Sequence, residues 1–162
     1  MKIYMNLLLW GTFLEEKDFF LLEDLANQGY AGVEIPLFEG EPTHYIKLAA
    51  ELKRLGLECS TVTCAGNDSN PLAKDVQGRS DALSFLKWAV DMSEILGAKI
   101  LIGPYYAAHG NFDFDESIEI LRERSANVMR DLADYAKEKG LDLGLEFLNR
   151  FETFLLNCSQ DT

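Results

Sequence analysis

The chain has 162 residues, 48% of them hydrophobic, which is enough for one compact domain with a buried core. Its 27 acidic and 15 basic residues give a formal net charge of −12, which argues against nucleic acid and anionic membranes as partners held by bulk electrostatics. The apolar run at the start of the chain is too short to cross a bilayer and lacks a small-residue cleavage site, so it predicts a first strand.

A recurring unit organises the chain: an amphipathic helix, then a glycine, then a short apolar strand. The four glycines are Gly29, Gly56, Gly97 and Gly140, each placed where a helix ends in a left-handed cap. The apolar stretch after each glycine is typical of a strand buried on both faces. In chain order, strands are predicted at about 2–10, 32–37, 58–64, 99–105 and 142–148, and helices at 17–28, 43–55, 79–96 and 116–139.

Strict alternation of strands and helices predicts parallel strands joined by right-handed crossovers in a single α/β domain over residues 1–162. The turns from helix to strand are short, whereas the loops after the third and fourth strands are long and polar. Long loops at the carboxyl ends of parallel strands are where α/β proteins build their sites. We therefore look for functional residues at these strand ends.

The cysteines do not indicate a disulfide framework or a zinc site. Cys59, Cys64 and Cys158 are odd in number and form no C-x-x-C pair. Free thiols fit a reducing compartment, so we expect a cytoplasmic protein.

Several residues near strand ends are candidates for a site. An acidic residue in an apolar strand, such as Glu146, is costly unless something binds it. Glu34, between Val33 and Ile35, is either near a substrate or a buried acid bonded to backbone. Trp10 and Tyr106 either line a ligand pocket or take part in ordinary packing, because aromatic faces do both.

Three motifs, GVEIPLFE at 32–39, GPYYAAHG at 103–110 and LEFLNRFE at 145–152, together resemble the ketose 3-epimerases. These are the D-tagatose and D-psicose (allulose) epimerases of the xylose-isomerase-like sugar isomerase/epimerase superfamily. The last motif is the most specific, because the family has an L-E-x-x-N-R-F-E run there. The resemblance implies a partial TIM barrel, from the first to the fifth strand of a (β/α)8 barrel.

The resemblance also implies a function, which is metal-dependent epimerisation of a ketose. The family removes a proton beside a carbonyl to form an enediolate, which a bound metal stabilises. By that pattern Glu146 is the first metal ligand and one of the bases, and Glu152 is a hydrogen-bond partner of the sugar. The implied metal is manganese, with magnesium or cobalt as alternatives.

Further sugar contacts follow from the same resemblance. Relatives place a small polar or thiol side chain at the end of the third strand, where this chain has Cys64 and Gly66; the alternative for Cys64 is a buried small hydrophobe. His109 stands where many relatives have Trp, so a hydrogen bond is expected in place of stacking. Arg150 is expected to orient Glu146 or Glu152, because a guanidinium binds carboxylates bidentately.

The chain departs from the family in length. A complete barrel needs about 250 residues, and the Asp, His and final Glu of the family's metal site have no counterpart here. We therefore expect a truncated chain with an incomplete site, and a homodimer or larger assembly that covers the open sheet edges.

Two alternatives stay open at this point. One is a non-catalytic half-barrel that self-associates and binds sugar weakly or not at all. The other is a different activity of the same superfamily, as in hydroxypyruvate isomerase-like or inosose dehydratase-like enzymes. The N-R-F-E ending favours ketose epimerisation over these.

Overall fold

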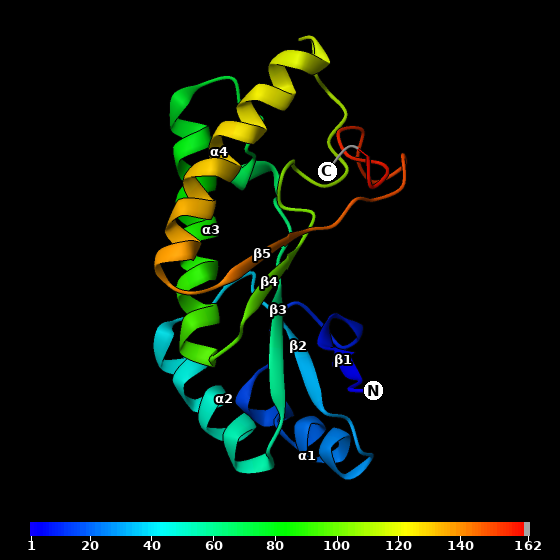
Figure 1. Cartoon of the computed structure of the whole chain (residues 1–162), viewed down its shortest axis with the longest axis vertical. Helices are drawn as coiled ribbons and strands as arrows, with labels where there is room; N and C mark the ends of the chain where they lie inside the picture. Colours follow the sequence, from blue (N-terminus) through cyan, green and yellow to red (C-terminus); the bar gives the residue numbers. More distant parts are fainter. Residues whose placement is uncertain (161–162) are drawn as a thin grey trace.

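The computed structural model describes residues 1–160, and within them five strands form one parallel sheet in the order β1-β2-β3-β4-β5 (Figure 1). The strands are β1 (Tyr4–Asn6), β2 (Gly32–Pro36), β3 (Glu58–Val62), β4 (Ile100–Gly103) and β5 (Asp142–Leu145). The α-helices between them are α1 (Phe20–Asn27), α2 (Pro42–Leu55), α3 (Val76–Leu96) and α4 (Ile118–Glu138). The predicted alternation of parallel strands and helices is confirmed.

The first strand is shorter than the strand predicted at 2–10. It ends at Asn6, whose side chain accepts a hydrogen bond from the Leu8 amide at 2.8 Å and so starts the 3-10 helix Leu7–Leu9. Leu7 is buried there, whereas Leu9 and Trp10 are exposed. The local cap therefore ends the strand and leaves Leu8, Leu9 and Trp10 exposed, while Leu7 stays in the main core.

The other predicted boundaries shift for similar local reasons. Helix α3 begins at Val76, earlier than predicted, because the Asp75 carboxylate accepts a hydrogen bond from the Gly78 amide at 2.7 Å. The later strands end before their predicted limits, and β5 ends at Leu145 instead of 148. Residues after each strand belong to the long loops.

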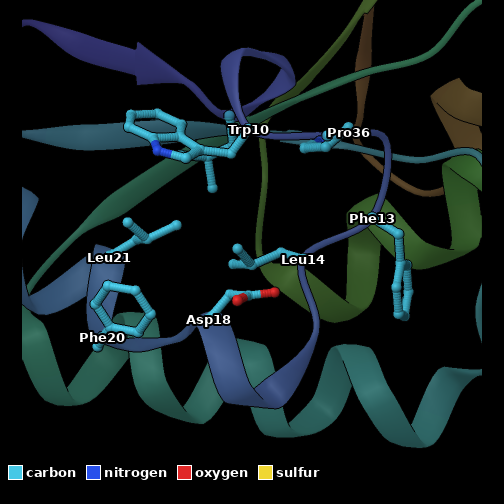
Figure 2. A pocket seen from close by; sticks show the side chains of 9 residues that line it. Trp10, Phe13, Leu14, Asp18, Phe20, Leu21 and Pro36 are labelled. Atoms are coloured by element: carbon cyan, nitrogen blue, oxygen red, sulfur yellow. The ribbon is translucent and has the colours of Figure 1, made fainter.

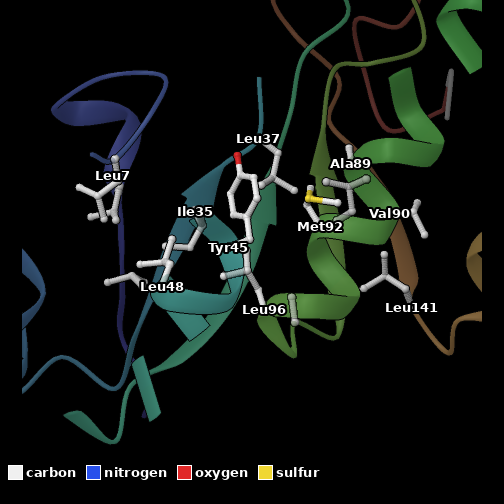
Figure 3. Packing of buried hydrophobic residues seen from close by; sticks show 14 of the residues in the cluster. Leu7, Ile35, Leu37, Tyr45, Leu48, Ala89, Val90, Met92, Leu96 and Leu141 are labelled. Carbon is white, nitrogen blue, oxygen red and sulfur yellow. The ribbon is translucent and has the colours of Figure 1, made fainter. Parts of the chain in front are cut away.

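The main core lies between the sheet and the helices, which cover one face of the sheet (Figures 1 and 3). On β2, Val33 and Ile35 are fully buried on this face. One buried hydrogen bond joins sheet and helix, between the Thr61 and Ser93 hydroxyls at 2.7 Å. The core side chains labelled in Figure 3 are Leu7, Ile35, Leu37, Tyr45, Leu48, Ala89, Val90, Met92, Leu96 and Leu141.

The opposite face of the sheet carries the alternate residues of each strand. Glu34, Ile100 and Ile102 are half-buried there, and Ser60 is 8% exposed. The helices of the described residues leave this face uncovered (Figure 1). None of these helices combines the length and the apolar character that a membrane crossing requires.

Strands β3 and β4 approach closely at Gly103, and this contact generates a stability prediction. Gly103 has φ of 144°, and a Cβ added to it would lie 1.9 Å from the Thr63 carbonyl oxygen. Gly103→Ala must push the two strands apart, so we expect it to lower the free energy of unfolding by more than about 3 kcal/mol. Urea unfolding followed by circular dichroism measures the loss.

The matched control is Gly97→Ala. Gly97 also has positive φ, at 75°, but an added Cβ would have nothing within 4 Å. The left-handed conformation alone should cost about 1 kcal/mol there. Equal losses for the two variants would contradict a specific contact between β3 and β4.

Candidate active site

The loops that follow β3, β4 and β5 are bonded to one another at the carboxyl edge of the sheet. The His109 amide donates to the Ala65 carbonyl at 2.9 Å, and the Gly110 amide donates to the Glu152 carbonyl at 2.8 Å. Between side chains, Asn111 Nδ2 donates to Asn67 Oδ1 at 2.8 Å. The three segments therefore form one connected rim, in which the predicted site residues have fixed neighbours.

A hollow of about 520 Å³ opens on this rim and brings three predicted residues together. Cys64, Gly66 and His109 line it, although they come from two different loops. The remaining lining residues are Phe38, Ala65, Asn67, Asp68, Ser69 and Phe85. Its volume is within the range of small-molecule sites.

Glu146 lies one residue beyond β5, with its amide donating to the Gly103 carbonyl at 3.2 Å. Strand alternation directs it to the face opposite the helices, and its side chain is exposed. Its charge reaches the hollow: burial, followed by the carboxylates of Glu146 and Glu152, raises the pKa of the Cys64 thiol to about 11. Cys64 is therefore a neutral thiol at physiological pH.

Glu34 is held by side chains from the two neighbouring strands. Asn6 Nδ2 donates to its Oε1 at 2.7 Å, and Ser60 Oγ donates to its Oε2 at 3.2 Å. The parallel register makes this possible, because Asn6, Glu34 and Ser60 are direct partners across β1, β2 and β3. Burial raises the pKa of Glu34, the Ser60 hydrogen bond opposes that rise, and the charge of Glu146 adds to it.

The partners of Glu34 were not among the residues that the sequence singled out. Asn6 and Ser60 are polar residues inside strands, and their spacing in the chain does not reveal the pairing. Only the register across three strands brings them to Glu34.

The segment after β5 holds Glu152 in a tight turn. Asn149 Nδ2 donates to the Glu152 carboxylate, and Asn149 Oδ1 accepts from the Phe151 amide at 2.9 Å. His109 Nε2 lies 3.8 Å from Glu152 Oε1. In residues 1–160, Arg150 is exposed and forms no ion pair with Glu146 or Glu152, so Asn149 takes the orienting role expected of Arg150.

Tyr106 is buried and does not line the Cys64 hollow, although Glu146 and Cys64 are both close enough to act on its hydroxyl. Its hydroxyl donates to the Leu156 carbonyl at 3.2 Å, and burial raises its pKa to about 12. It packs in a second, smaller hydrophobic cluster that joins the loop after β4 to the segment after β5. That cluster consists of Leu72, Tyr106, Ala107, Leu121, Leu155 and Leu156.

Trp10 is also separate from the Cys64 hollow. It follows the 3-10 helix after β1, is 47% exposed, and lines a different hollow of about 300 Å³ (Figure 2). No residue lines both hollows. The structure therefore groups Cys64, Gly66 and His109 around one hollow. Glu146 and Glu152 are close enough for their charges to act on Cys64. Trp10 does not belong to this group.

The described residues do not by themselves make a metal site. Within residues 1–160, no three His, Cys, Asp or Glu side chains are close enough together to hold an ion. Glu146 offers a hard carboxylate oxygen of the kind that Mn²⁺ and Mg²⁺ prefer. It would be one ligand of several, and the others are not among these residues.

Known proteins resemble this chain over most of its length. A model of the family described as xylose isomerase-like TIM barrel matches residues 22–162. An L-ribulose 3-epimerase of Methylomonas sp. (strain DH-1) is 32% identical over 135 residues, which cover 82% of this chain and 46% of that protein. A ketose 3-epimerase of Arthrobacter globiformis is 28% identical over 161 residues, which cover 99% of this chain and 55% of that protein.

The fold comparison agrees. The crystal structure of a D-allulose 3-epimerase from Methylomonas sp. in complex with D-allulose matches 99% of this chain and 56% of its own, with a TM-score of 0.89 and 24% identity. The chain thus spans about half the length of these relatives. The predicted partial barrel is confirmed, with five parallel strands alternating with helices. The chain belongs to the xylose isomerase-like TIM barrel family.

Proposed function

We propose that this chain carries the first part of a ketose 3-epimerase site, in which a proton is moved at a sugar carbon beside the carbonyl. One observation carries the proposal: Glu146 at the end of β5 and Glu152 in the following turn both act on Cys64, which lines the rim hollow. The names of the relatives, an L-ribulose 3-epimerase and a ketose 3-epimerase, support the substrate class.

In this proposal Glu146 is the base. Its carboxylate takes the proton from the sugar carbon and can return it, while the electron pair moves to the carbonyl oxygen. The charge that develops on that oxygen requires a cation or a hydrogen-bond donor. A divalent ion, manganese first and magnesium or cobalt as alternatives, supplies that charge stabilisation when bound, and Glu146 would be one of its ligands.

The other rim residues bind and orient the sugar in this proposal. Glu152, held by Asn149, accepts hydrogen bonds from sugar hydroxyls, and His109 beside it adds a polar contact. Cys64 contacts the sugar as a neutral thiol and is not a nucleophile, because its pKa is about 11. Glu34, on the same face of the sheet, is kept in place by Asn6 and Ser60.

Gly66 has a role that its surroundings support. A Cβ added there would meet only Ser69 Oγ, at 3.9 Å, so packing does not require a glycine. Its φ of −102° does not require one either. We propose that Gly66 leaves room for the sugar in the hollow. Tyr106 would act indirectly, by fixing the segment that carries Glu152, and a sugar contact for Trp10 stays a prediction.

We also propose that the protein is cytoplasmic and forms a homodimer or larger assembly. Cys59 and Cys64 form no disulfide within the described residues, which fits a reducing compartment. The half-buried Ile100 and Ile102 lie on the sheet face that the described helices leave uncovered, and a second copy would bury them.

Isotope exchange tests the chemistry. The protein is incubated with Mn²⁺ and D-fructose or D-psicose in heavy water. If this chain assembles a working site, across a dimer for example, deuterium enters the sugar at C3, and NMR detects it. Glu146→Gln should slow the exchange by at least about 100-fold, because it removes the base. Glu138→Gln, an exposed acid on α4, is the control and should keep the full rate.

The outcome decides between the enzyme and the half-barrel. Exchange that survives Glu146→Gln would contradict the assignment of the base. An absence of exchange in protein shown to be folded by circular dichroism would favour a non-catalytic half-barrel.

Alkylation of Cys64 tests whether Glu146 faces the hollow. The charge of Glu146 helps to raise the thiol pKa, so Glu146→Gln should lower that pKa and increase the thiolate fraction at a fixed pH below 11. We expect alkylation by iodoacetamide at pH 8.5 to become about two- to threefold faster. This is the effect on the thiolate fraction that the removal of one nearby negative charge should have. Rates are measured by mass spectrometry with Cys59 and Cys158 replaced.

Glu138→Gln serves again as the remote control and should leave the Cys64 rate unchanged. An equal rate in the wild-type and Glu146→Gln proteins would mean that the Glu146 side chain points away from Cys64. This test needs neither metal nor sugar.

Light scattering tests the assembly. We expect a mass of at least two chains at micromolar concentration, because a second copy would cover the open face. A soluble monomer under these conditions would contradict the proposed assembly.

A further inference from the structure

The hollow beside Trp10 has a chemical character of its own (Figure 2). It lies between the segment after β1, the start of α1 and the end of β2, and it encloses about 300 Å³. Trp10, Leu14, Phe20 and Leu21 provide apolar and aromatic walls, and Asp18 is the one charged residue that lines it. The hollow is therefore an aromatic pocket with a single carboxylate.

The Asp18 carboxylate lines this pocket and lies beside Leu14 (Figure 2). Throughout residues 1–160 its side chain has no hydrogen bond or ion pair. Two lysines are nearby in sequence or space, but each binds a different acid. Lys17 Nζ lies 2.7 Å from Glu15 Oε1, and Lys47 Nζ lies 2.5 Å from Glu16 Oε1. Asp18 therefore forms no salt bridge with either lysine, although its charge acts on Lys17.

This combination selects for a cation with an apolar part. A half-buried carboxylate is stabilised by a positive charge close to it. Aromatic faces attract cations as well, and Trp10 and Phe20 are accessible, at 47% and 59% exposure. An anion would be repelled by Asp18 and by the net charge of −12. A neutral ligand could donate a hydrogen bond to the carboxylate but would not balance its charge.

We propose that this pocket binds a small organic ammonium ion. The ammonium group would bind the Asp18 carboxylate, and the alkyl part would pack against Trp10, Leu14 and Phe20. The site goes beyond the proposed epimerisation and does not rest on it, because it shares no residue with the Cys64 hollow. It also gives Trp10 a role other than a sugar contact.

The two tryptophans of the chain allow a direct test. The indole N–H signal of Trp10 in a ¹H–¹⁵N NMR spectrum reports on the pocket. The signal of Trp88, whose ring stacks on Phe85 with centroids 5.6 Å apart, is the internal reference. The probe is n-butylammonium chloride at constant ionic strength, and the matched neutral probe is n-butanol.

We expect n-butylammonium to shift the Trp10 signal until it saturates, with a dissociation constant in the millimolar range because the ligand is small. The Trp88 signal should not move. Butanol should bind at least about tenfold more weakly, since it cannot form the charged hydrogen bond. Asp18→Asn keeps the shape of the side chain and should weaken n-butylammonium binding by about the same factor. Glu23→Gln, on α1 and outside the pocket, should not change it.

Three results would overturn the proposal. Equal binding of butanol and n-butylammonium would mean a purely apolar groove. An unchanged Trp10 signal, with the Trp88 signal of the folded protein present, would mean that no ammonium binds. A Trp10 shift on dilution of the protein alone would mean that a side chain of a second copy occupies the pocket. None of these results bears on isotope exchange at Glu146.

Discussion

The alternation of side chains along parallel strands is the constraint on which the rest of this structure depends. On β2, Val33 and Ile35 are fully buried under the helices, and Glu34 between them points to the other face. The same alternation directs Ser60 and Glu146 to that face and Thr61 toward α3, where it bonds Ser93. One face therefore stabilises the fold, and the other presents carboxylates.

The acids of this protein fall into two groups by their partners. Glu58 is bound by Lys2 and Tyr4, and Glu116 is bound by Arg124 at 2.6 and 2.7 Å, and in both cases these bonds lower the pKa of the acid. Among the described residues, no lysine or arginine pairs with Glu34, Glu146 or Glu152. Acids bound by cations hold elements together, whereas acids without such cations are available to a ligand or a proton.

Asp18 also lacks a salt bridge, but it lies beyond the carboxyl ends of β1 and β2 and lines a different hollow from Cys64. The cap formed by Asn6 ends β1 early, which leaves Trp10 beside Asp18 and not over the rim hollow. The same chain segment that a longer strand would have kept in the sheet thus builds a second pocket. The two hollows therefore have different walls and share no lining residue.

The sequence by itself determined the alternating fold, the glycines that end the helices, and the strand ends that carry Cys64, Gly66, His109, Glu146 and Glu152. These are local properties, set by hydrophobic period, backbone conformation and loop length. The expected roles of Glu146 and Glu152 came from the resemblance of LEFLNRFE to the epimerases. The pattern of polar and apolar residues does not predict these roles.

Only the tertiary structure decided which side chains meet. Register across three strands gave Glu34 its partners Asn6 and Ser60. The turn after β5 placed Asn149, and not Arg150, on Glu152. Packing placed Tyr106 in a buried cluster, and Trp10 lines a different hollow from Cys64. Such contacts join residues far apart in the chain or depend on the direction of a turn. The spacing of residues along a strand predicts neither kind of contact.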